Sequence, residues 1–444
     1  MKKILAYSVA LSAIFVMSGC GGGNSGDSAN GQAHVAFSKH PSPRVDALFK
    51  TDGTSAGIVE GDWDRLTDGI DSLQRETIDN VEIYGDYVYY TATTTADPGV
   101  LLPEIKARSY RNKVTNNETE VINESHSPML DADKRFKTSN GLYMFEIEGR
   151  AIFKYASNGI RTDYEISLPH HMIPASDLGK VVVGDIIYFG VRVQGSNISD
   201  LESYGVAKFD TTNNTFAMVI GLKYVKVGRM HYSDDGNKLY INATTNASGS
   251  GIYAFHLDTP SIPPVLLIEN VYANKNFLLY DGDIYVIGQT INTLQLGLYL
   301  IKPDIDHGYT TMVTGTSVGR ETLFAYHNAV YAVIGGKLWW VDGDHELQGI
   351  MMITYSPNID GHFVEANDKV YFAHTESGTG FELYALEHNH HVALAHEIAA
   401  GTDSSYPSHL TELDGNIVFQ ATEDGVDNGL YKYDTNTDVL TTLY

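Results

Sequence analysis

Short runs in which apolar and polar residues alternate recur along most of this chain. Each run begins at a turn residue and closes on an aromatic residue, as in Gly85–Tyr89 and Gly282–Tyr285. Alternation over so few residues, bounded by Gly, Asn or Asp, is typical of β-strands that follow tight hairpin turns. The closing aromatic residues lie 40 to 54 residues apart, at Tyr89, Tyr143, Tyr188, Tyr240, Tyr285, Tyr331, Tyr371 and Phe419. The pattern therefore predicts eight copies of one structural repeat.

A second apolar run follows each first run after a short connection. The clearest copies are Gly251–Phe255, Gly297–Leu300, Gly336–Trp340, Glu382–Ala385 and Gly429–Tyr433, and weaker copies are 108–110, 151–155 and 205–209. An Asp and a polar turn often come next, and then a third β-rich run such as 216–220 or 439–443. Each unit of about fifty residues is thus predicted to hold about four short strands, with almost no helical periodicity.

A single four-stranded unit of this length cannot bury both faces of its sheet. Several units packed face to face around an axis can do so, and this is the architecture of a β-propeller. We therefore predict an all-β fold, a β-propeller of eight four-stranded blades. Seven blades is the alternative count because the copies between 107 and 155 are irregular, and a stack of β-sandwich domains is the competing architecture.

The first twenty residues have the features of a secretion signal. Lys2 and Lys3 precede a short apolar stretch, 4–17, which is too short to cross a bilayer comfortably as a helix. The stretch runs into Val16–Cys20, which resembles the bacterial lipobox, although Met17 stands where Leu is commoner. This resemblance implies that Cys20 is acylated and becomes the new N-terminus.

The chain is accordingly divided into three predicted parts. These are a lipoprotein signal peptide (1–19), a lipidated Cys20 with a flexible Gly/Ser/Asn tether (20–43), and a single propeller domain (44–444). Acyl chains on Cys20 would make the membrane a binding partner. Residue 21 is Gly and not the Asp of the enterobacterial inner-membrane retention signal. We therefore expect an outer-membrane lipoprotein, at either the periplasmic or the cell-surface face.

Charge and cysteine content narrow the classes of function. Acidic residues outnumber basic residues 55 to 30, which gives a formal charge of −25 at pH 7. Phosphate recognition needs clustered Lys and Arg, so we expect no nucleic-acid partner. The single cysteine excludes an intrachain disulfide and a Cys-based zinc site.

Two stretches resemble a known bacterial repeat. Ala47–Gly57 is similar to the ELWxxDGT repeat of the hyalin-like family, with Phe49 where the family has Trp. The last unit, 400–431, and the segment Phe381–Tyr384 match further parts of the motif. The resemblance implies a secreted or surface propeller, and it supplies no catalytic residues.

A sequence motif of serine nucleophiles occurs twice, but without the helix that should follow it. Gly-x-Ser-x-Gly occurs at Gly53–Gly57 and at Gly315–Gly319, but no helical pattern follows either copy, as a nucleophile elbow requires. We interpret both as turns of the repeat. We therefore predict no catalytic residues and no bound cofactor.

Metal ligation is considered at two kinds of position. His388, His390 and His391 are weak candidates for a transition-metal site, although a polar hairpin turn is the preferred interpretation. Asp-x-Asp pairs such as Asp281/Asp283 and Asp342/Asp344 would suit a structural Ca²⁺, but Asp-Gly is also a favoured hairpin turn.

These observations lead to one main functional hypothesis and two alternatives. The main hypothesis is a non-enzymatic, envelope-anchored binding or scaffold module for a protein or a glycan outside the cytoplasm. The first alternative is an enzyme that acts on a polysaccharide or a peptide at an axial site. The second is an outer-membrane assembly factor, which rests on architecture alone.

Overall fold

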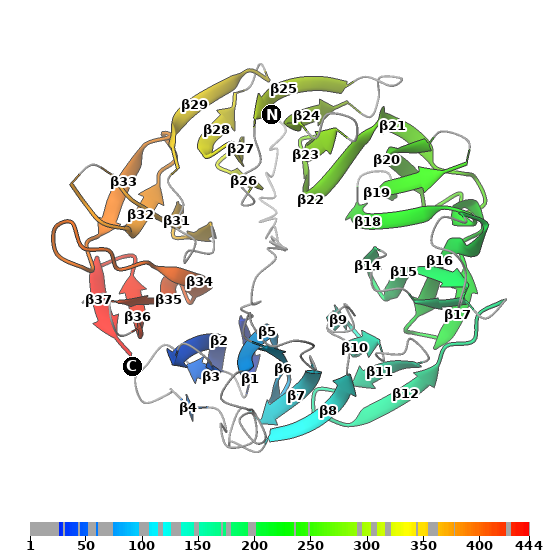
Figure 1. Cartoon of the computed structure of the whole chain (residues 1–444), viewed down its shortest axis with the longest axis horizontal. Coiled ribbons are helices and arrows are strands. Elements are labelled where there is room, and N and C mark those ends of the chain that lie inside the picture. Colours follow the sequence, from blue (N-terminus) through cyan, green and yellow to red (C-terminus); the bar gives the residue numbers. More distant parts are fainter. Residues whose placement is uncertain are drawn as a thin grey trace, which may run out of the picture.

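The order of strands in the sheets follows the sequence repeat. The computed structural model describes residues 26–29, 32–42, 45–51, 59–60, 74–96, 106–113, 119–125, 135–145, 151–169, 172–174, 179–193, 201–234, 237–246, 249–290, 295–302, 309–315, 321–342, 345–353, 363–376, 378–422 and 428–443. These residues form eight sheets, here called A to H in chain order. The sheets stand around a common centre, as the cartoon shows (Figure 1).

Sheets A to D occupy the first part of the ring. Sheet A contains β1 (Gly26–Ala29), β2 (Gln32–Ser42), β3 (Val45–Thr51), β4 (Val59–Glu60), β5 (Gln74–Tyr84), β6 (Tyr87–Ala96), β7 (Lys106–Lys113) and β8 (Thr119–Ser125). Sheet B contains β9 (Arg135–Thr138), β10 (Gly141–Phe145), β11 (Ala151–Tyr155) and β12 (Arg161–Glu165). Sheet C contains β13 (Met172–Pro174), β14 (Lys180–Val183), β15 (Ile186–Val193), β16 (Tyr204–Asp210) and β17 (Thr215–Met218). Sheet D contains β18 (Lys226–Ser233), β19 (Lys238–Thr245), β20 (Gly249–His256) and β21 (Val265–Glu269).

Sheets E to H complete the ring. Sheet E contains β22 (Val271–Tyr280), β23 (Asp283–Thr290), β24 (Leu296–Ile301) and β25 (Tyr309–Gly315). Sheet F contains β26 (Thr322–Tyr326), β27 (Ala329–Ile334), β28 (Lys337–Val341) and β29 (Leu347–Met352). Sheet G contains β30 (Val364–Ala366), β31 (Lys369–His374), β32 (Glu382–Leu386) and β33 (Val392–His396). Sheet H contains β34 (Ser408–Leu413), β35 (Asn416–Thr422), β36 (Asn428–Asp434) and β37 (Val439–Thr442).

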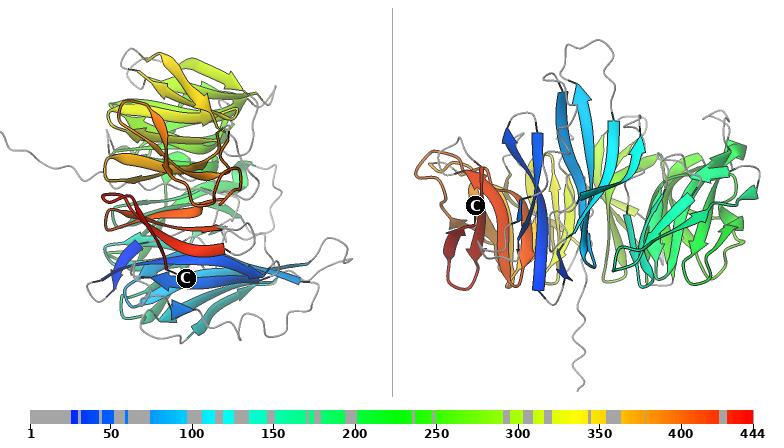
Figure 2. Two further views of the ribbon diagram at one scale, coloured as in Figure 1. Left: turned by 90° about the vertical axis from the view of Figure 1, so that its left-hand side faces the viewer. Right: turned by 90° about the horizontal axis from the view of Figure 1, so that it is seen from below.

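Each four-stranded sheet is an antiparallel meander with its first strand near the centre and its fourth strand at the rim, as the views along and across the ring axis show (Figures 1 and 2). Two short 3₁₀ segments, η3 (Leu201–Ser203) and η4 (Ile220–Leu222), flank strands of sheet C. The all-β propeller fold predicted from the sequence is confirmed. No helix in the described part of the chain is both long enough and apolar enough to cross a membrane.

The first hairpin of each sheet turns where the sequence predicts. In sheets E to H both central turn residues have positive φ, as at Asp281 (51°) and Gly282 (79°), or Asn367 (44°) and Asp368 (58°). Two consecutive positive φ angles define the type I′ turn, whose twist matches that of the flanking strands. Asn, Asp and Gly adopt these angles at least cost, and they explain the turn residues of the repeat.

The closing aromatic residues of the repeat hold neighbouring sheets together. Tyr89 in β6, Tyr143 in β10 and Tyr371 in β31 each pack against a strand of the next sheet, namely β11, β16 and β36. Ring centroids are 5.2 Å apart for Tyr89 and Tyr155, 5.8 Å for Tyr143 and Phe209, and 5.8 Å for Tyr371 and Tyr433. All six side chains are buried. Such pairs contribute about 0.5–1.5 kcal/mol beyond the burial of their area.

Glu382 organises the connection between sheets G and H. Its carboxylate is fully buried and accepts hydrogen bonds from Ile398 N (2.7 Å), Ala399 N (3.4 Å), Ser405 N (3.3 Å) and Ser405 Oγ (2.8 Å). Burial raises the pKa of Glu382, although these donors act in the opposite direction. The glutamate in the segment that resembles the ELWxxDGT motif therefore has a structural role here.

The eight-blade count is not confirmed, because sheet A unites two groups of strands. The groups β1–β4 and β5–β8 are joined by a parallel bridge between Val45 and Glu76. In Figure 1, β1–β3 lie between sheet H and β5, and β2 is adjacent to β34. Strands β1 and β2 fall inside the segment 20–43 that the sequence predicts as a tether. Val35, Ala36 and Phe37 form a short apolar run there, which is consistent with a strand.

Candidate functional site

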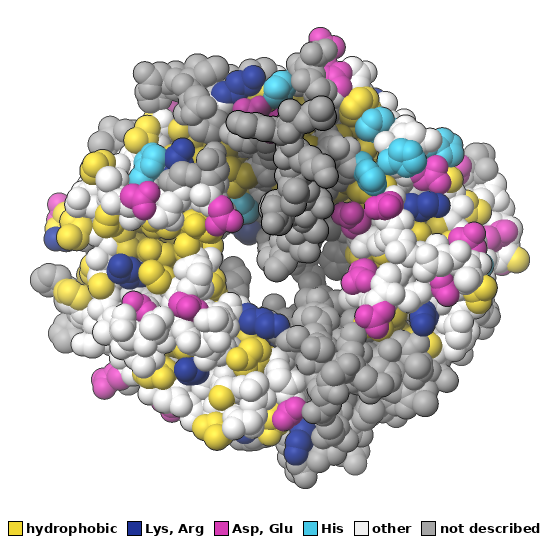
Figure 3. All heavy atoms as spheres, turned by 180° about the vertical axis from the view of Figure 1, so that it is seen from behind, with side chains coloured by type: hydrophobic (Ala, Val, Ile, Leu, Met, Phe, Trp, Pro, Cys, Tyr) yellow, Lys and Arg dark blue, Asp and Glu magenta, His cyan; other side chains and the backbone are white. Residues whose placement is uncertain are grey.

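Histidine side chains gather at one end of sheets F and G. We call this region the histidine face and define it as His327, His345, His388, His390 and His391. The first and third hairpins of an antiparallel four-stranded sheet lie at the same end, and these residues come from such hairpins. The space-filling view shows several histidines close together on this side of the molecule (Figure 3).

The third hairpins of sheets F and G have the same conformation. His345 (φ 63°) and His390 (φ 64°) both occupy the left-handed region. The N–H of His345 donates to Asp342 O (3.0 Å), and the N–H of His390 donates to Glu387 O (3.0 Å). Histidine is enriched among the non-glycine residues that adopt this conformation. The hairpin turn predicted for 388–391 is thereby confirmed.

His345 reaches back to the preceding sheet. Its Nε2 lies 2.7 Å from Oδ2 of Asp283, the first residue of β23. A carboxylate oxygen only accepts, so Nε2 carries a proton and the neutral ring keeps its lone pair on Nδ1. The side chains of His345 and Asp283 are 35% and 18% exposed, respectively. Solvent therefore reaches an imidazole whose orientation is fixed by a largely shielded carboxylate.

His390 reaches sheet F in the same way but meets a phenol. Its Nδ1 lies 2.6 Å from the hydroxyl of Tyr331, and its ring stacks on Trp340 with centroids 3.7 Å apart and planes at 15°. Burial raises the pKa of Tyr331 to about 12 and lowers the pKa of His390. The phenol therefore keeps its proton, and the direction of its hydrogen bond with Nδ1 depends on which nitrogen of the imidazole carries the proton.

The remaining histidines of this face are exposed. The rings of His327 and His388 lie 5.7 Å apart, and His327 Nε2 lies 3.8 Å from Asp368 Oδ1. Lys369 pairs with Glu387 at 3.3 Å. Within the described ranges, no three His, Cys, Asp or Glu side chains are grouped so that they could hold a metal ion. The structure therefore does not bring His388, His390 and His391 together as a ligand set.

Other positions that the sequence singled out lie in turns or outside the described residues. Asp281 and Asp283 flank the first hairpin turn of sheet E, and Asp342 begins the third hairpin of sheet F. Gly315 ends β25. Cys20, the Ser residues of both Gly-x-Ser-x-Gly stretches and the pair His170–His171 lie outside the described residues.

Sequence reasoning did not single out His345, and it treated Asp283 as part of a turn. The two residues are 62 positions apart and belong to different sheets. The repeat itself could have indicated this pair. In a ring of such units, the third hairpin of one unit lies beside the second strand of the preceding unit. Tyr331 and Trp340 were recognised only as members of the repeat.

Comparison with known proteins finds structural neighbours but no family. No family model and no curated protein matches the chain. The solved structures that resemble it include a prolyl endopeptidase, with a TM-score of 0.40 and 10% identity, covering 83% of this chain and 49% of that one. A puromycin-hydrolysing peptidase of Mycobacterium tuberculosis has a TM-score of 0.40 and 11% identity, covering 84% of this chain and 53% of that one. An oligogalacturonate lyase of Vibrio parahaemolyticus has a TM-score of 0.38 and 8% identity, covering 71% of this chain and 98% of that one.

The comparisons correct the main functional hypothesis. The sequence predicted a non-enzymatic binding or scaffold module, and the comparisons contradict this prediction, because the natural structural neighbours include peptidases, hydrolases and lyases. The chain spans about half the length of the two peptidases. At these identities and TM-scores the likeness transfers no substrate or activity to this chain, so the chemistry must be argued from its own residues.

Proposed function

We propose that this chain is an enzyme that cleaves a polysaccharide or a peptide by general-base catalysis, with His345 as the base and Asp283 as the residue that orients it. The observation on which this rests is the hydrogen bond of 2.7 Å between His345 Nε2 and Asp283 Oδ2. The site lies where the second strand of sheet E meets the third hairpin of sheet F, and so away from the axial position that the sequence alternative assumed.

The pair has the two properties that a general base requires. Asp283 fixes the ring so that Nδ1 presents a lone pair, and it stabilises the imidazolium that forms when Nδ1 takes a proton. Nδ1 has no hydrogen-bond partner in the described part of the chain. It can therefore take a proton from water, or from a carbon next to a carbonyl, and return it to the leaving group.

Two neighbouring groups support a role in binding substrate. His390 comes from the equivalent hairpin of the next sheet, and in the tautomer whose Nδ1 accepts from Tyr331 its Nε2 can donate to an oxygen of the substrate. The exposed rings of His327 and His388 add polar surface on the same face. An open face suits a polymer better than a small molecule, which would need an enclosing pocket.

The cellular site is part of the proposal. Acylation of Cys20 would hold the enzyme in the outer membrane, and the resemblance to the ELWxxDGT family, which is found outside the cytoplasm, supports this location. Mass spectrometry of the full-length chain purified from membranes should show added acyl mass on an N-terminal Cys20, and Cys20→Ala should lack it. A wild-type chain without acyl mass on Cys20 would contradict acylation at this residue.

The catalytic proposal is tested on the mature chain with Cys20→Ser. The chain is incubated with a panel of polysaccharides and a peptide mixture, and new reducing ends and amino termini are measured by mass spectrometry. We expect cleavage of one class, with His345→Gln slower by about 10²–10⁴-fold. His256→Gln, at the exposed end of β20, is the matched control and should keep the full rate. Absence of cleavage, or equal rates for His345→Gln and the wild type, would contradict the proposal.

A further inference from the structure

Sheets G and H meet where the first hairpin of sheet G contacts the third hairpin of sheet H. Asn367 directly follows the first strand of sheet G, and its Nδ2 donates at 3.0 Å to Oδ1 of Asn436, the second residue after the third strand of sheet H. At the F–G junction the first of these positions is His327, and the second is His388. Two imidazoles therefore stand where the next junction has two amides.

The rings of His327 and His388 are close enough to share one metal ion. Their centroids are 5.7 Å apart with planes at 51°, and both side chains are exposed. Two imidazoles bound to one tetrahedral metal ion have centroids about 5.3 Å apart, given a metal–nitrogen distance of about 2.1 Å. A shift of about half an ångström in these exposed side chains thus gives the separation of a shared ligand pair.

Carboxylates gather around this pair. Asp368 Oδ1 lies 3.8 Å from His327 Nε2. The ring of Tyr326 packs edge-on against His327, with centroids 4.5 Å apart. Burial raises the pKa of Tyr326, and the negative charges of Glu365, Asp368 and Glu387 raise it further, so all three carboxylates lie near this end of the junction.

The balance of charge beside the two histidines favours a cation. Lys369 pairs with Glu387 at 3.3 Å and so offsets one of the three carboxylates. The other two, Glu365 and Asp368, belong to the same end of sheet G as His388. A surface with an excess of negative charge raises the local concentration of divalent cations.

We propose that His327 and His388 form a two-histidine site for a transition-metal ion such as Zn²⁺, which joins sheet F to sheet G. Imidazole is a preferred ligand of Zn²⁺, Ni²⁺ and Cu²⁺. Water completes the coordination, because no third ligand is grouped with the pair in the described part of the chain. His388 thus finds its partner in sheet F, and not in its own hairpin as the sequence suggested.

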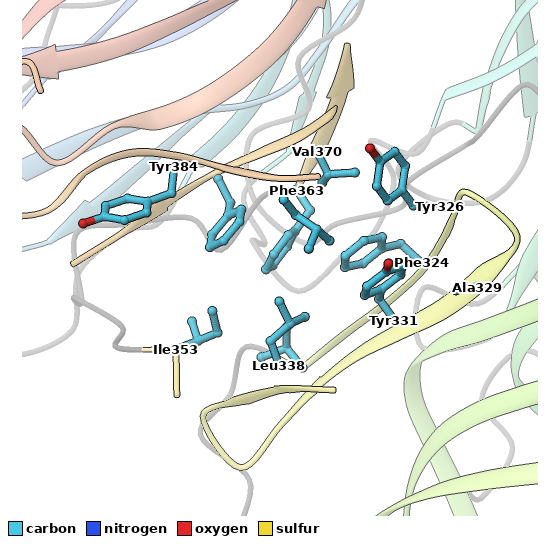
Figure 4. Close-up of a cluster of buried hydrophobic side chains, with 12 residues drawn as sticks. Phe324, Tyr326, Ala329, Tyr331, Leu338, Ile353, Phe363, Val370 and Tyr384 are labelled. Carbon is cyan, nitrogen blue, oxygen red and sulfur yellow. The ribbon is translucent and has the colours of Figure 1, made fainter. Parts of the chain in front are cut away.

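An ion bound here would stabilise the edge of the core between two sheets. Tyr326 belongs to the cluster of buried apolar side chains between sheets F and G, together with Phe324 and Phe363 (Figure 4). Its hydroxyl donates to the carbonyl oxygen of Asp368, so the first hairpins of both sheets meet beside the proposed ligands. The unfolded chain does not hold the two histidines together, so metal binding should favour the folded chain.

Isothermal titration of the mature, untagged chain carrying Cys20→Ser with Zn²⁺ tests the site. Asn is the replacement used, because it tolerates the positive φ of His327 (43°) and stands at both equivalent positions of the G–H junction. We expect His327→Asn and His388→Asn each to bind Zn²⁺ at least about tenfold more weakly than the parent chain, since even changes beside a ligand cost that much. His391→Asn removes another exposed histidine of the same hairpin and should bind like the parent chain.

Thermal unfolding provides a second readout. Zn²⁺ should raise the melting temperature of the parent chain and of His391→Asn, but not that of the double variant His327→Asn/His388→Asn. An excess of Mg²⁺, which prefers oxygen ligands, should not displace Zn²⁺. A parent chain that binds no Zn²⁺, a double variant that binds it as tightly as the parent chain, or loss of binding in His391→Asn would overturn the proposal. None of these outcomes depends on whether the chain cleaves a polymer.

Discussion

The buried histidine at the end of β31 should make the fold sensitive to acid. His374 is 2% exposed, and its ring packs edge-on against Tyr384 with centroids 5.0 Å apart. Its Nδ1 has no hydrogen-bond partner among the described residues. Burial lowers the pKa of His374 to about 4. The folded chain therefore holds this ring neutral at pH values where the unfolded chain binds a proton.

The size of the effect follows from the two pKa values. A difference between about 6.5 in the unfolded chain and about 4 in the folded chain corresponds to about 3 kcal/mol, at 1.36 kcal/mol for each tenfold change. The stabilisation is complete above pH 6.5 and is lost as the pH falls towards 4. Between pH 7.5 and pH 5.0, His374 alone should lower the free energy of unfolding by about 2 kcal/mol.

Urea unfolding of the mature chain, followed by circular dichroism at both pH values, measures this loss. His374→Phe fills the site with a ring of similar shape that cannot bind a proton, so its loss between pH 7.5 and 5.0 should be smaller than that of the wild type by about 2 kcal/mol. His256→Phe removes an exposed histidine and should lose as much as the wild type. Equal losses for His374→Phe and the wild type would refute the reasoning.

Three further predictions concern the framework. Glu382→Ala leaves the buried N–H of Ile398 without its acceptor and Ser405 with Phe381 O alone, so it should lower the free energy of unfolding by about 2 kcal/mol in urea, whereas an unchanged value would show that the carboxylate is dispensable. Gly380→Ala should prevent folding, as judged by circular dichroism, because a Cβ would overlap the carbonyl oxygen of Asp403; Gly282→Ala, which meets open space, should cost only about 1–2 kcal/mol for its positive φ. Tyr371→Ala should lower the melting temperature strongly and Tyr371→Phe only slightly, because Tyr371 contacts Tyr433 mainly through its ring. Similar losses in the two variants would contradict this, since they would show that the hydroxyl of Tyr371 matters more than its ring.

The repeat could be predicted from the sequence because its turns and strands depend on neighbouring residues. A type I′ turn requires Asn, Asp or Gly, and a buried strand requires alternating apolar residues, so the first hairpins and their closing aromatic residues could be placed from neighbouring residues. The buried contacts of Tyr89, Tyr143 and Tyr371 with the next sheet follow once the repeat is arranged in a ring.

Closure of the ring and the candidate site depend on contacts between distant segments. The bridge between Val45 and Glu76 merges two strand groups into one sheet, and no local pattern specifies it. The Asp283–His345 bond requires a left-handed histidine in one sheet to face the start of a strand in another, across 62 positions. The strands in the predicted tether are different, since the sequence does contain a short apolar run at 35–37, directly after the Gly/Ser/Asn-rich run that predicts a flexible segment.

The claim that Asp283 and His345 act as one catalytic unit is tested most directly by a double-mutant cycle on the rate of polymer cleavage. The rate is measured for the mature chain, Asp283→Asn, His345→Gln and the double variant. If Asp283 works only by orienting His345, the double variant should be no slower than His345→Gln. Rate losses that simply multiply in the double variant would contradict the account, because they would show that the two side chains act independently.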